Sequence, residues 1–166
     1  MTRLRRGVFL AVAAGTLGGL CWLPTGLAFL LPVYFALMTR ALRHAETGGD
    51  AARIGAAFAA TRYAVSSHFL LALLRFSPLA IVFYLLAVLF ITPMGILEGW
   101  GAFVVRRRTG LALSLGFGAF YVLLEKLRTL GDLAFPADLA EHSFGSFPAG
   151  LGWASVIGPF GVRFVC

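Results

Sequence analysis

Long apolar stretches separated by short polar segments make up most of the chain. A transmembrane helix needs roughly 20 apolar residues to cross the hydrocarbon core of a bilayer. The apolar stretches run over 8–39, 54–74, 79–105, 111–124 and 149–165. The first is long enough for two crossings, so the pattern predicts five or six helices. Strands are excluded, because apolar and polar residues do not alternate and because the stretches are rich in Ala and Leu.

The first stretch is broken by Leu23-Pro24-Thr25-Gly26, which predicts a helical hairpin with its turn at this point. Pro32 then falls inside the second helix, where we expect it to produce a kink. We predict a single all-α domain over 1–166, a polytopic transmembrane helical bundle of five to six helices. The expected elements are helices over 7–22, 25–40, 53–74, 78–105, 109–129 and 149–166, and an external segment over 131–148.

The composition also indicates a membrane protein. Of the 166 residues, 60% are hydrophobic and only 13% are charged, and the mean hydropathy is +0.89. A soluble domain of this size has too little interior to bury so much apolar surface. One alternative concerns the first helix, because Arg3, Arg5 and Arg6 before an apolar run with small residues also fit a cleaved signal peptide. We favour a retained helix, since the next segment is again apolar enough to enter the membrane.

The basic residues mark one side of the predicted membrane, because Lys and Arg are retained preferentially in cytoplasmic loops. Nine of the fourteen basic residues fall on the side of the amino terminus: Arg3, Arg5, Arg6, Arg40, Arg43, Arg53, Arg106, Arg107 and Arg108. The external segment instead carries Asp132, Asp138 and Glu141. We therefore predict a multi-pass protein of the bacterial inner (cytoplasmic) membrane with a cytoplasmic amino terminus. The net charge of +7 is an orientation signal rather than a nucleic-acid-binding surface.

Side chains that commonly carry chemistry are sparse. Cys21 and Cys166 give no metal-ligand spacing and no disulfide framework, and the three histidines lie far apart in the sequence. No phosphate-binding glycine loop or serine elbow is present. The sequence therefore predicts no catalytic residue and no metal site. The glycines at positions 15, 18, 19, 116 and 118 instead indicate close helix packing in lipid.

Two ionisable residues fall inside the predicted helices. Arg62 lies nine residues beyond Arg53, and Glu98 lies eight residues before Arg106. At 1.5 Å per residue both are roughly 12–14 Å from the cytoplasmic surface. Because an ionised group at this depth normally faces a partner or a wet cavity, we predict an intramembrane ion pair between Arg62 and Glu98. We prefer a pair that orients two helices over a catalytic pair, and Arg163 is an alternative partner for the glutamate.

Four short motifs carry a resemblance to a known family. They are Leu124-Glu125-Lys126-Leu127-Arg128, Ala134-Phe135-Pro136, Gly158-Pro159-Phe160-Gly161, and Leu23-Pro24-Thr25-Gly26-Leu27-Ala28-Phe29 followed by Pro32. Together they resemble the amino-terminal transmembrane domain of apolipoprotein N-acyltransferase. In that family a helix ends in Glu-x-x-Arg, an external segment carries Gly-Phe-Pro-Trp, and the next helix contains Gly-x-Tyr-Gly. This chain departs from the pattern at Ala134, Ala137, Gly152 and Phe160, and its middle matches only in hydropathy and loop placement.

The resemblance implies a part in lipoprotein maturation. In this family a nitrilase-like domain uses Glu, Lys and Cys to move an acyl chain from a phospholipid to the amino-terminal cysteine of a lipoprotein. We expect the 166 residues to be a fragment or a truncated relative that lacks this domain and is inactive alone. Glu125, Lys126 and Cys166 do not replace the missing set, because adjacent helical residues point in different directions.

The resemblance also names candidate interface residues, which are Phe135, Pro136, Glu125 and Arg128. The partners it implies are membrane phospholipid and a lipoprotein substrate, with no nucleic acid, no cofactor and no particular oligomeric state. The alternative hypothesis is a small non-enzymatic membrane scaffold or transporter subunit, in which Arg62 and Glu98 serve a substrate path.

Overall fold

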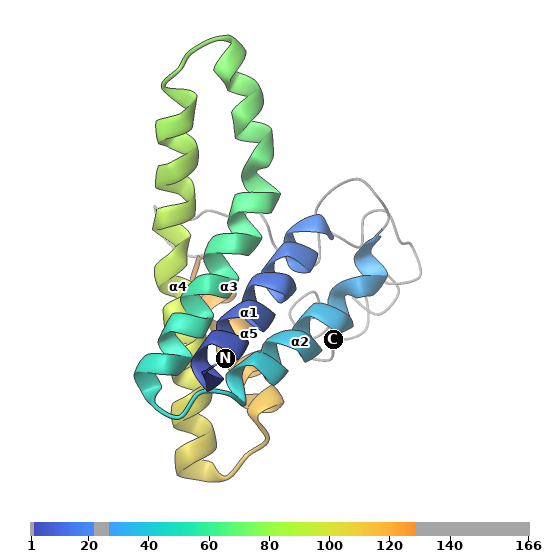
Figure 1. Ribbon diagram of the computed structural model, residues 1–166, viewed down its shortest axis with the longest axis vertical. Helices are drawn as coiled ribbons and strands as arrows, with labels where there is room; N and C mark the ends of the chain where they lie inside the picture. The colour runs from blue at the N-terminus through green and yellow to red at the C-terminus, as the bar shows by residue number, and fades with distance from the viewer. Residues whose placement is uncertain (1, 22–26, 129–166) are drawn as a thin grey trace.

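The computed structural model describes residues 2–21 and 27–128 as a bundle of helices (Figure 1). Its elements are α1 (Arg3–Leu20), the 3-10 helix η1 (Leu27–Leu30), α2 (Leu31–Leu42), α3 (Gly48–Ser66), the 3-10 helix η2 (Ser67–Arg75), α4 (Ala80–Thr109) and α5 (Leu113–Arg128). No strand occurs within the two described ranges, so the predicted all-α class is confirmed for them. The helix predicted over 149–166 and the external segment over 131–148 lie outside the described residues.

Helices α3 and α4 extend beyond their apolar stretches. A polar cap marks the start of α3, and a glycine cap marks the end of α4. Thr47 and Asp50 form a capping box in which each side chain accepts a hydrogen bond from the other's backbone N–H at 3.1 Å. This box starts α3 at Gly48, five residues before the expected start at 53. Helix α4 continues to Thr109, beyond the expected end at 105, and Gly110 closes it with a φ of 69°. Glycine adopts this left-handed conformation without strain.

Pro32 lies at the start of a helix rather than within one. The chain forms the 3-10 helix η1 and then enters α2 at Leu31, with the proline in the first turn. A proline there costs little, because its missing N–H would have had no partner inside the helix. The kink expected inside a continuous helix over 25–40 is therefore replaced by a change from 3-10 to α geometry.

Helices α3 and α4 form an antiparallel hairpin that extends beyond the other helices (Figure 1). Their backbones approach so closely that a Cβ atom added to Gly55 would overlap the carbonyl oxygen of Gly95. A Cβ atom on Gly99 would likewise overlap the carbonyl oxygen of Ala51. Small residues at a helix contact permit such close packing. These glycines therefore fix the register of the hairpin.

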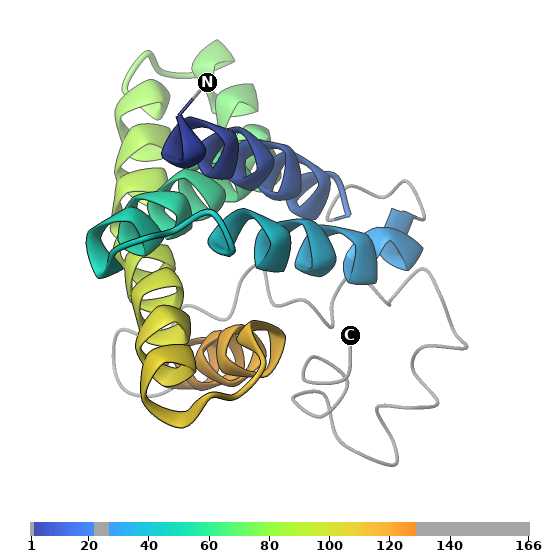
Figure 2. The same ribbon diagram turned by 60° about the horizontal axis from the view of Figure 1, so that its bottom comes forward.

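Helix α1 packs along α3 on a glycine face, as the sequence predicts. A Cβ atom added to Gly15 would lie 2.5 Å from the carbonyl oxygen of Phe58, and one added to Gly19 would lie 2.7 Å from that of Arg62. Helix α2 packs against α1, and α5 packs against α4 and touches α2 (Figure 2). At Gly118 of α5, by contrast, no described atom lies within 4 Å of an added Cβ atom. Close packing is therefore found at positions 15 and 19 and not, among the described residues, at position 118.

An aromatic cluster fills the space where α2, α3 and α5 meet. Phe35 contacts Tyr121 edge to face, with ring centroids 5.0 Å apart, and Phe58 contacts Phe117 in the same way at 6.0 Å. Tyr34 stacks on Phe35 with centroids 4.3 Å apart. All five side chains are buried. Such pairs stabilise packing by about 0.5–1.5 kcal/mol beyond the area that they bury.

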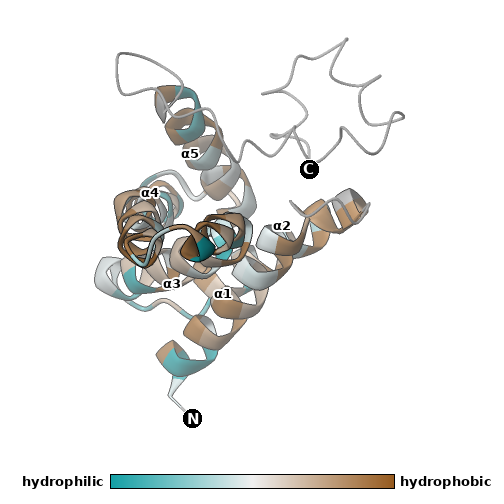
Figure 3. Ribbon diagram, turned by 90° about the horizontal axis from the view of Figure 1, so that it is seen from above, coloured by the Kyte–Doolittle hydropathy of each residue, from teal (hydrophilic) through white to brown (hydrophobic). Residues whose placement is uncertain are grey.

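The outer surface of the hairpin is apolar. On α4 the exposed side chains include Phe83, which is 64% exposed, and Leu89, which is 67% exposed. Apolar colouring predominates on α4 and is interrupted by hydrophilic patches towards the projecting end of the hairpin (Figure 3). Two helical segments, Gly48–Arg75 and Ala80–Thr109, are long and apolar enough to cross a membrane.

Candidate functional site

The most distinctive polar group in the described interior is Arg62 on α3, whose exposure is only 2%. Helix α1 packs against it at Gly18. A Cβ atom added to Gly18 would lie 3.4 Å from Cδ of Arg62 and 3.5 Å from Cγ of Tyr34, which are ordinary contact distances. The arginine stem and the tyrosine ring therefore both lie beside α1 at this point.

The guanidinium of Arg62 reaches from α3 to α5. Its Nη1 donates a hydrogen bond to the hydroxyl of Tyr121, and its Nη2 lies 3.8 Å from Oε1 of Glu125. Tyr121 and Glu125 are four residues apart on one helix, so they share a face. Glu125 is as deeply buried as its partner, at 3% exposure. The structure therefore holds a buried ion pair with a tyrosine hydroxyl beside it.

Three tyrosine rings surround the same cation. The guanidinium carbon of Arg62 lies 6.0 Å from the ring centroid of Tyr34 and 5.4 Å from those of Tyr63 and Tyr121. Aromatic faces attract a cation electrostatically, and the attraction strengthens where water is excluded. We call Arg62, Glu125, Tyr34, Tyr63 and Tyr121 the arginine cluster. It supplies a charged and hydrogen-bonding centre within an otherwise apolar bundle.

The sequence predicted Arg62 as a buried charge but missed the tyrosines around it. The chain has four tyrosines, and three of them belong to the arginine cluster. Their position inside apolar stretches was the available signal, because a buried tyrosine hydroxyl usually finds a polar partner. The four-residue spacing of Tyr121 and Glu125 was a second signal, since it places both side chains on one helical face.

Glu98 lies on α4 and is also buried. Because of the register in which α3 and α4 pack, it lies at a different height along the hairpin from Arg62. Its neighbour Gly99 packs against Ala51 and Gly55. Arg62 instead lies next to Tyr63, which packs with Ile91. These contacts separate the two levels by about two helical turns, on the order of 10 Å. The ion pair between Arg62 and Glu98 stays a prediction, and the pair seen at Arg62 is with Glu125.

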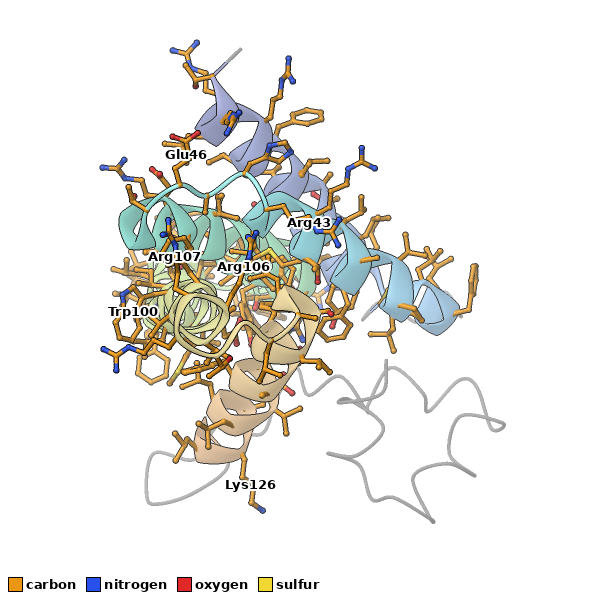
Figure 4. All side chains as sticks on the ribbon, turned by 90° about the horizontal axis from the view of Figure 1, so that it is seen from below. Arg43, Glu46, Trp100, Arg106, Arg107 and Lys126 are labelled. Atoms are coloured by element: carbon orange, nitrogen blue, oxygen red, sulfur yellow. The ribbon has the colours of Figure 1, made fainter. Side chains whose placement is uncertain are left out.

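The structure describes only part of the candidate interface. Glu125 points into the bundle, whereas its neighbour Lys126 is exposed and projects away from the bundle (Figure 4). The two adjacent side chains thus point in different directions, as expected for neighbours on a helix. Arg128 is the last residue of α5. Phe135 and Pro136, with the rest of the external segment, lie outside the described residues.

Metal-binding side chains do not gather in the described part of the chain. Within residues 2–21 and 27–128, no three of the His, Cys, Asp and Glu side chains lie close enough together to hold one ion.

Cys21 is buried and its Sγ lies 3.3 Å from the carbonyl oxygen of Leu27. This contact ties the end of α1 to the start of η1.

These features define a class: an all-helical domain with two helices able to cross a membrane and a buried polar cluster between its helices. The family is more specific. The model of the apolipoprotein N-acyltransferase N-terminal domain matches residues 14–166, and the chain belongs to this family. Neither the curated proteins nor the solved structures provide a match to the chain.

Proposed function

We propose that this chain is the membrane domain of an apolipoprotein N-acyltransferase-like protein of the bacterial inner membrane. Its function is to hold phospholipid and lipoprotein where a nitrilase-like domain transfers an acyl chain to the lipoprotein's amino-terminal cysteine. The observation that carries this proposal is the family match over residues 14–166. By themselves, the 166 residues are expected to catalyse no transfer.

The exposed apolar surface of the hairpin supports insertion in a bilayer. In water, side chains such as Phe83, Leu86, Leu89 and Phe90 would leave a large apolar patch uncovered. Lipid covers the same surface without cost. Five to six crossings follow if the apolar stretches outside α3 and α4 also cross the membrane, and such a multi-pass bundle is part of the proposal.

The grouping of the arginines supports a cytoplasmic amino terminus. The start of α1 lies beside the α2–α3 connection, because Arg3 Nη1 is 3.1 Å from Glu46 Oε1. The end of α4 meets the same connection, where Arg107 Nη2 donates to the carbonyl oxygen of Glu46 at 3.4 Å. Three basic segments thus share one end of the bundle (Figure 1). Because arginine is retained on the cytoplasmic side, we assign this end to the cytoplasm.

In this proposal the arginine cluster positions helices and does not react. It ties α5 to α3, and α5 ends at Arg128, directly before the external segment. The external segment, with Phe135 and Pro136, is the proposed meeting place of lipid substrate, lipoprotein and catalytic domain. Its mixture of aromatic, proline and acidic residues suits the bilayer interface.

A chimeric enzyme tests the proposal. Residues 1–166 would replace the amino-terminal domain of a relative, in front of that relative's nitrilase-like domain, and acyl transfer to a diacylated lipoprotein would be measured in membranes. We expect transfer, and we expect its loss in Phe135→Ala/Pro136→Ala with normal membrane insertion. The relative's own enzyme and its catalytic-cysteine variant set the upper and lower limits. A chimera that inserts normally but transfers nothing would favour a scaffold or transporter subunit.

A further inference from the structure

The basic end of the bundle contains two adjoining hollows. One, of about 530 Å³, lies beside the α4–α5 connection and is lined by Arg43, Arg106 and the stretch from Gly110 to Ser114. The other, of about 320 Å³, is lined by Arg3, Arg43, Phe103, Arg106, Arg107 and the residues Ala45 and Glu46. Both volumes fall within the range of roughly 300–1,000 Å³ that is usual for small-molecule sites. Arg43 and Arg106 line both hollows, so these two arginines stand at the centre of the combined space.

The charge in this space is poorly balanced. Among the described residues, four arginines line it and Glu46 is the only acidic lining residue. Glu46 is already engaged, with its carboxylate 3.1 Å from Arg3 and its carbonyl oxygen accepting from Arg107. Within the described ranges Arg43 and Arg106 form no ion pair (Figure 4). Two neighbouring cations with no counter-charge from the described part of the chain favour an anionic ligand between them.

Apolar side chains border the same space. Leu111, which is 49% exposed, and Leu113 line the larger hollow, and Phe103 lines the smaller one, with its ring centroid 5.3 Å from the guanidinium carbon of Arg107. A soluble anion would gain nothing from these walls. A ligand with an anionic head and a hydrocarbon body would use both parts of the site.

We propose that Arg43 and Arg106 bind the phosphate headgroup of an anionic phospholipid, with its acyl chains leaving along Leu111 and the outer face of α5. Arginine binds phosphate through paired N–H donors, and basic pockets between transmembrane helices on the cytoplasmic side bind lipid headgroups. The site lies at the end of the bundle opposite to the projecting hairpin tip. This inference rests on the proposed membrane function, because only then does lipid surround the site.

Lipid retention by the whole chain tests the inference. The chain would be purified in a neutral detergent and titrated with phosphatidylglycerol or phosphatidylcholine, and bound lipid would be counted by native mass spectrometry. We expect preferential retention of phosphatidylglycerol and about 30-fold weaker retention in Arg43→Gln/Arg106→Gln. Arg5→Gln/Arg6→Gln is the matched control, since it removes the same charge from an exposed face of α1 that lines neither hollow. The control is expected to retain phosphatidylglycerol as the parent does.

Three results would overturn the inference. Equal weakening in both double variants would mean that net charge alone attracts the lipid. Equal retention of phosphatidylcholine would mean that the headgroup charge is not recognised. Displacement of the lipid by millimolar inorganic phosphate would make the site one for a soluble anion. Each variant is first tested for resistance to alkaline extraction from membranes, so that failure of membrane insertion is recognised separately.

Discussion

Arg62 on α3 and Glu125 on α5 hold opposite charges 3.8 Å apart, measured from Nη2 to Oε1, inside the bundle. The hydroxyl of Tyr121 accepts a hydrogen bond from the same guanidinium. Because both charged side chains are almost fully buried, removing either one leaves the other buried without the opposite charge of this ion pair. The pair thus fixes α5 relative to α3.

Replacing Glu125 with Ala is expected to lower the free energy of unfolding by about 3–5 kcal/mol, because the charge of Arg62 then remains buried without the carboxylate. The double variant Arg62→Met/Glu125→Leu is expected to lose less, since neither charge remains. Unfolding by a denaturing detergent in mixed micelles measures both. Glu46→Ala is the control: its ion pair with Arg3 is exposed, so its loss should cost no more than about 1 kcal/mol. Equal losses for Glu125→Ala and Glu46→Ala would contradict a buried pair.

A double-mutant cycle separates the two candidate partners of Arg62. We expect a larger coupling energy between Arg62 and Glu125 than between Arg62 and Glu98. The reason is that Arg62 and Glu98 lie at different heights along the α3–α4 hairpin. Alanine variants of the three residues, singly and in pairs, provide both cycles. A larger coupling with Glu98 would instead support the pair predicted from the sequence.

Tyr121→Phe is expected to destabilise the bundle by about 1.5–3 kcal/mol, because its hydroxyl accepts a hydrogen bond from a buried cation. Tyr84→Phe is the matched control. The hydroxyl of Tyr84 donates to the carbonyl oxygen of Ala64 at 2.9 Å, a bond between neutral groups that contributes about 0.5–1.5 kcal/mol. Thermal unfolding in detergent compares the two variants. A smaller effect at Tyr121 than at Tyr84 would count against the arginine cluster as a stabilising centre.

Gly55→Ala tests the contact that sets the hairpin register. The added methyl group would overlap the carbonyl oxygen of Gly95, so α3 and α4 must separate, at a cost of about 1–3 kcal/mol. Gly118→Ala makes the same chemical change in α5, where no described atom lies within 4 Å. It is expected to be neutral or to stabilise the helix by about 0.5–1 kcal/mol. The same loss of stability in both variants would show that backbone contact at Gly55 is not the cause.

Hydropathy predicted the all-α class of the described residues because each apolar stretch is long and lacks alternation. It misplaced some helix ends, since Thr47, Asp50 and Gly110 act through hydrogen bonds and backbone conformation that hydropathy does not register. Arg62 was recognisable as a buried charge from its surroundings in sequence. Its partner was not, because choosing between Glu98 and Glu125 requires knowing which helices are neighbours.

The depth estimate for Glu98 depended on one assumption, which was that Arg53 and Arg106 lie at the same level. In the structure Ala51 packs against Gly99, so α4 continues about two turns past the level of Arg53 before it reaches Arg106. Counting from the two arginines therefore gave Arg62 and Glu98 the same depth, whereas the hairpin register separates their levels by about two helical turns. The spacing of Gly95 and Gly99 is typical of close helix packing, but it does not say which residues of another helix they contact, and the contact between Gly55 and Gly95 sets this register.

We propose that the basic end of the bundle faces the cytoplasm and that the α3–α4 hairpin crosses the membrane. Single cysteines at Gly49, near the basic end, and at Pro78, between η2 and α4, would be introduced in a Cys21→Ala/Cys166→Ala background, because both positions are exposed. A membrane-impermeant thiol reagent would be applied to intact spheroplasts. We expect Pro78→Cys to be labelled in intact spheroplasts and Gly49→Cys to be labelled only after the membrane is opened. Labelling of both positions, or of Gly49→Cys alone, in intact spheroplasts would contradict this proposal.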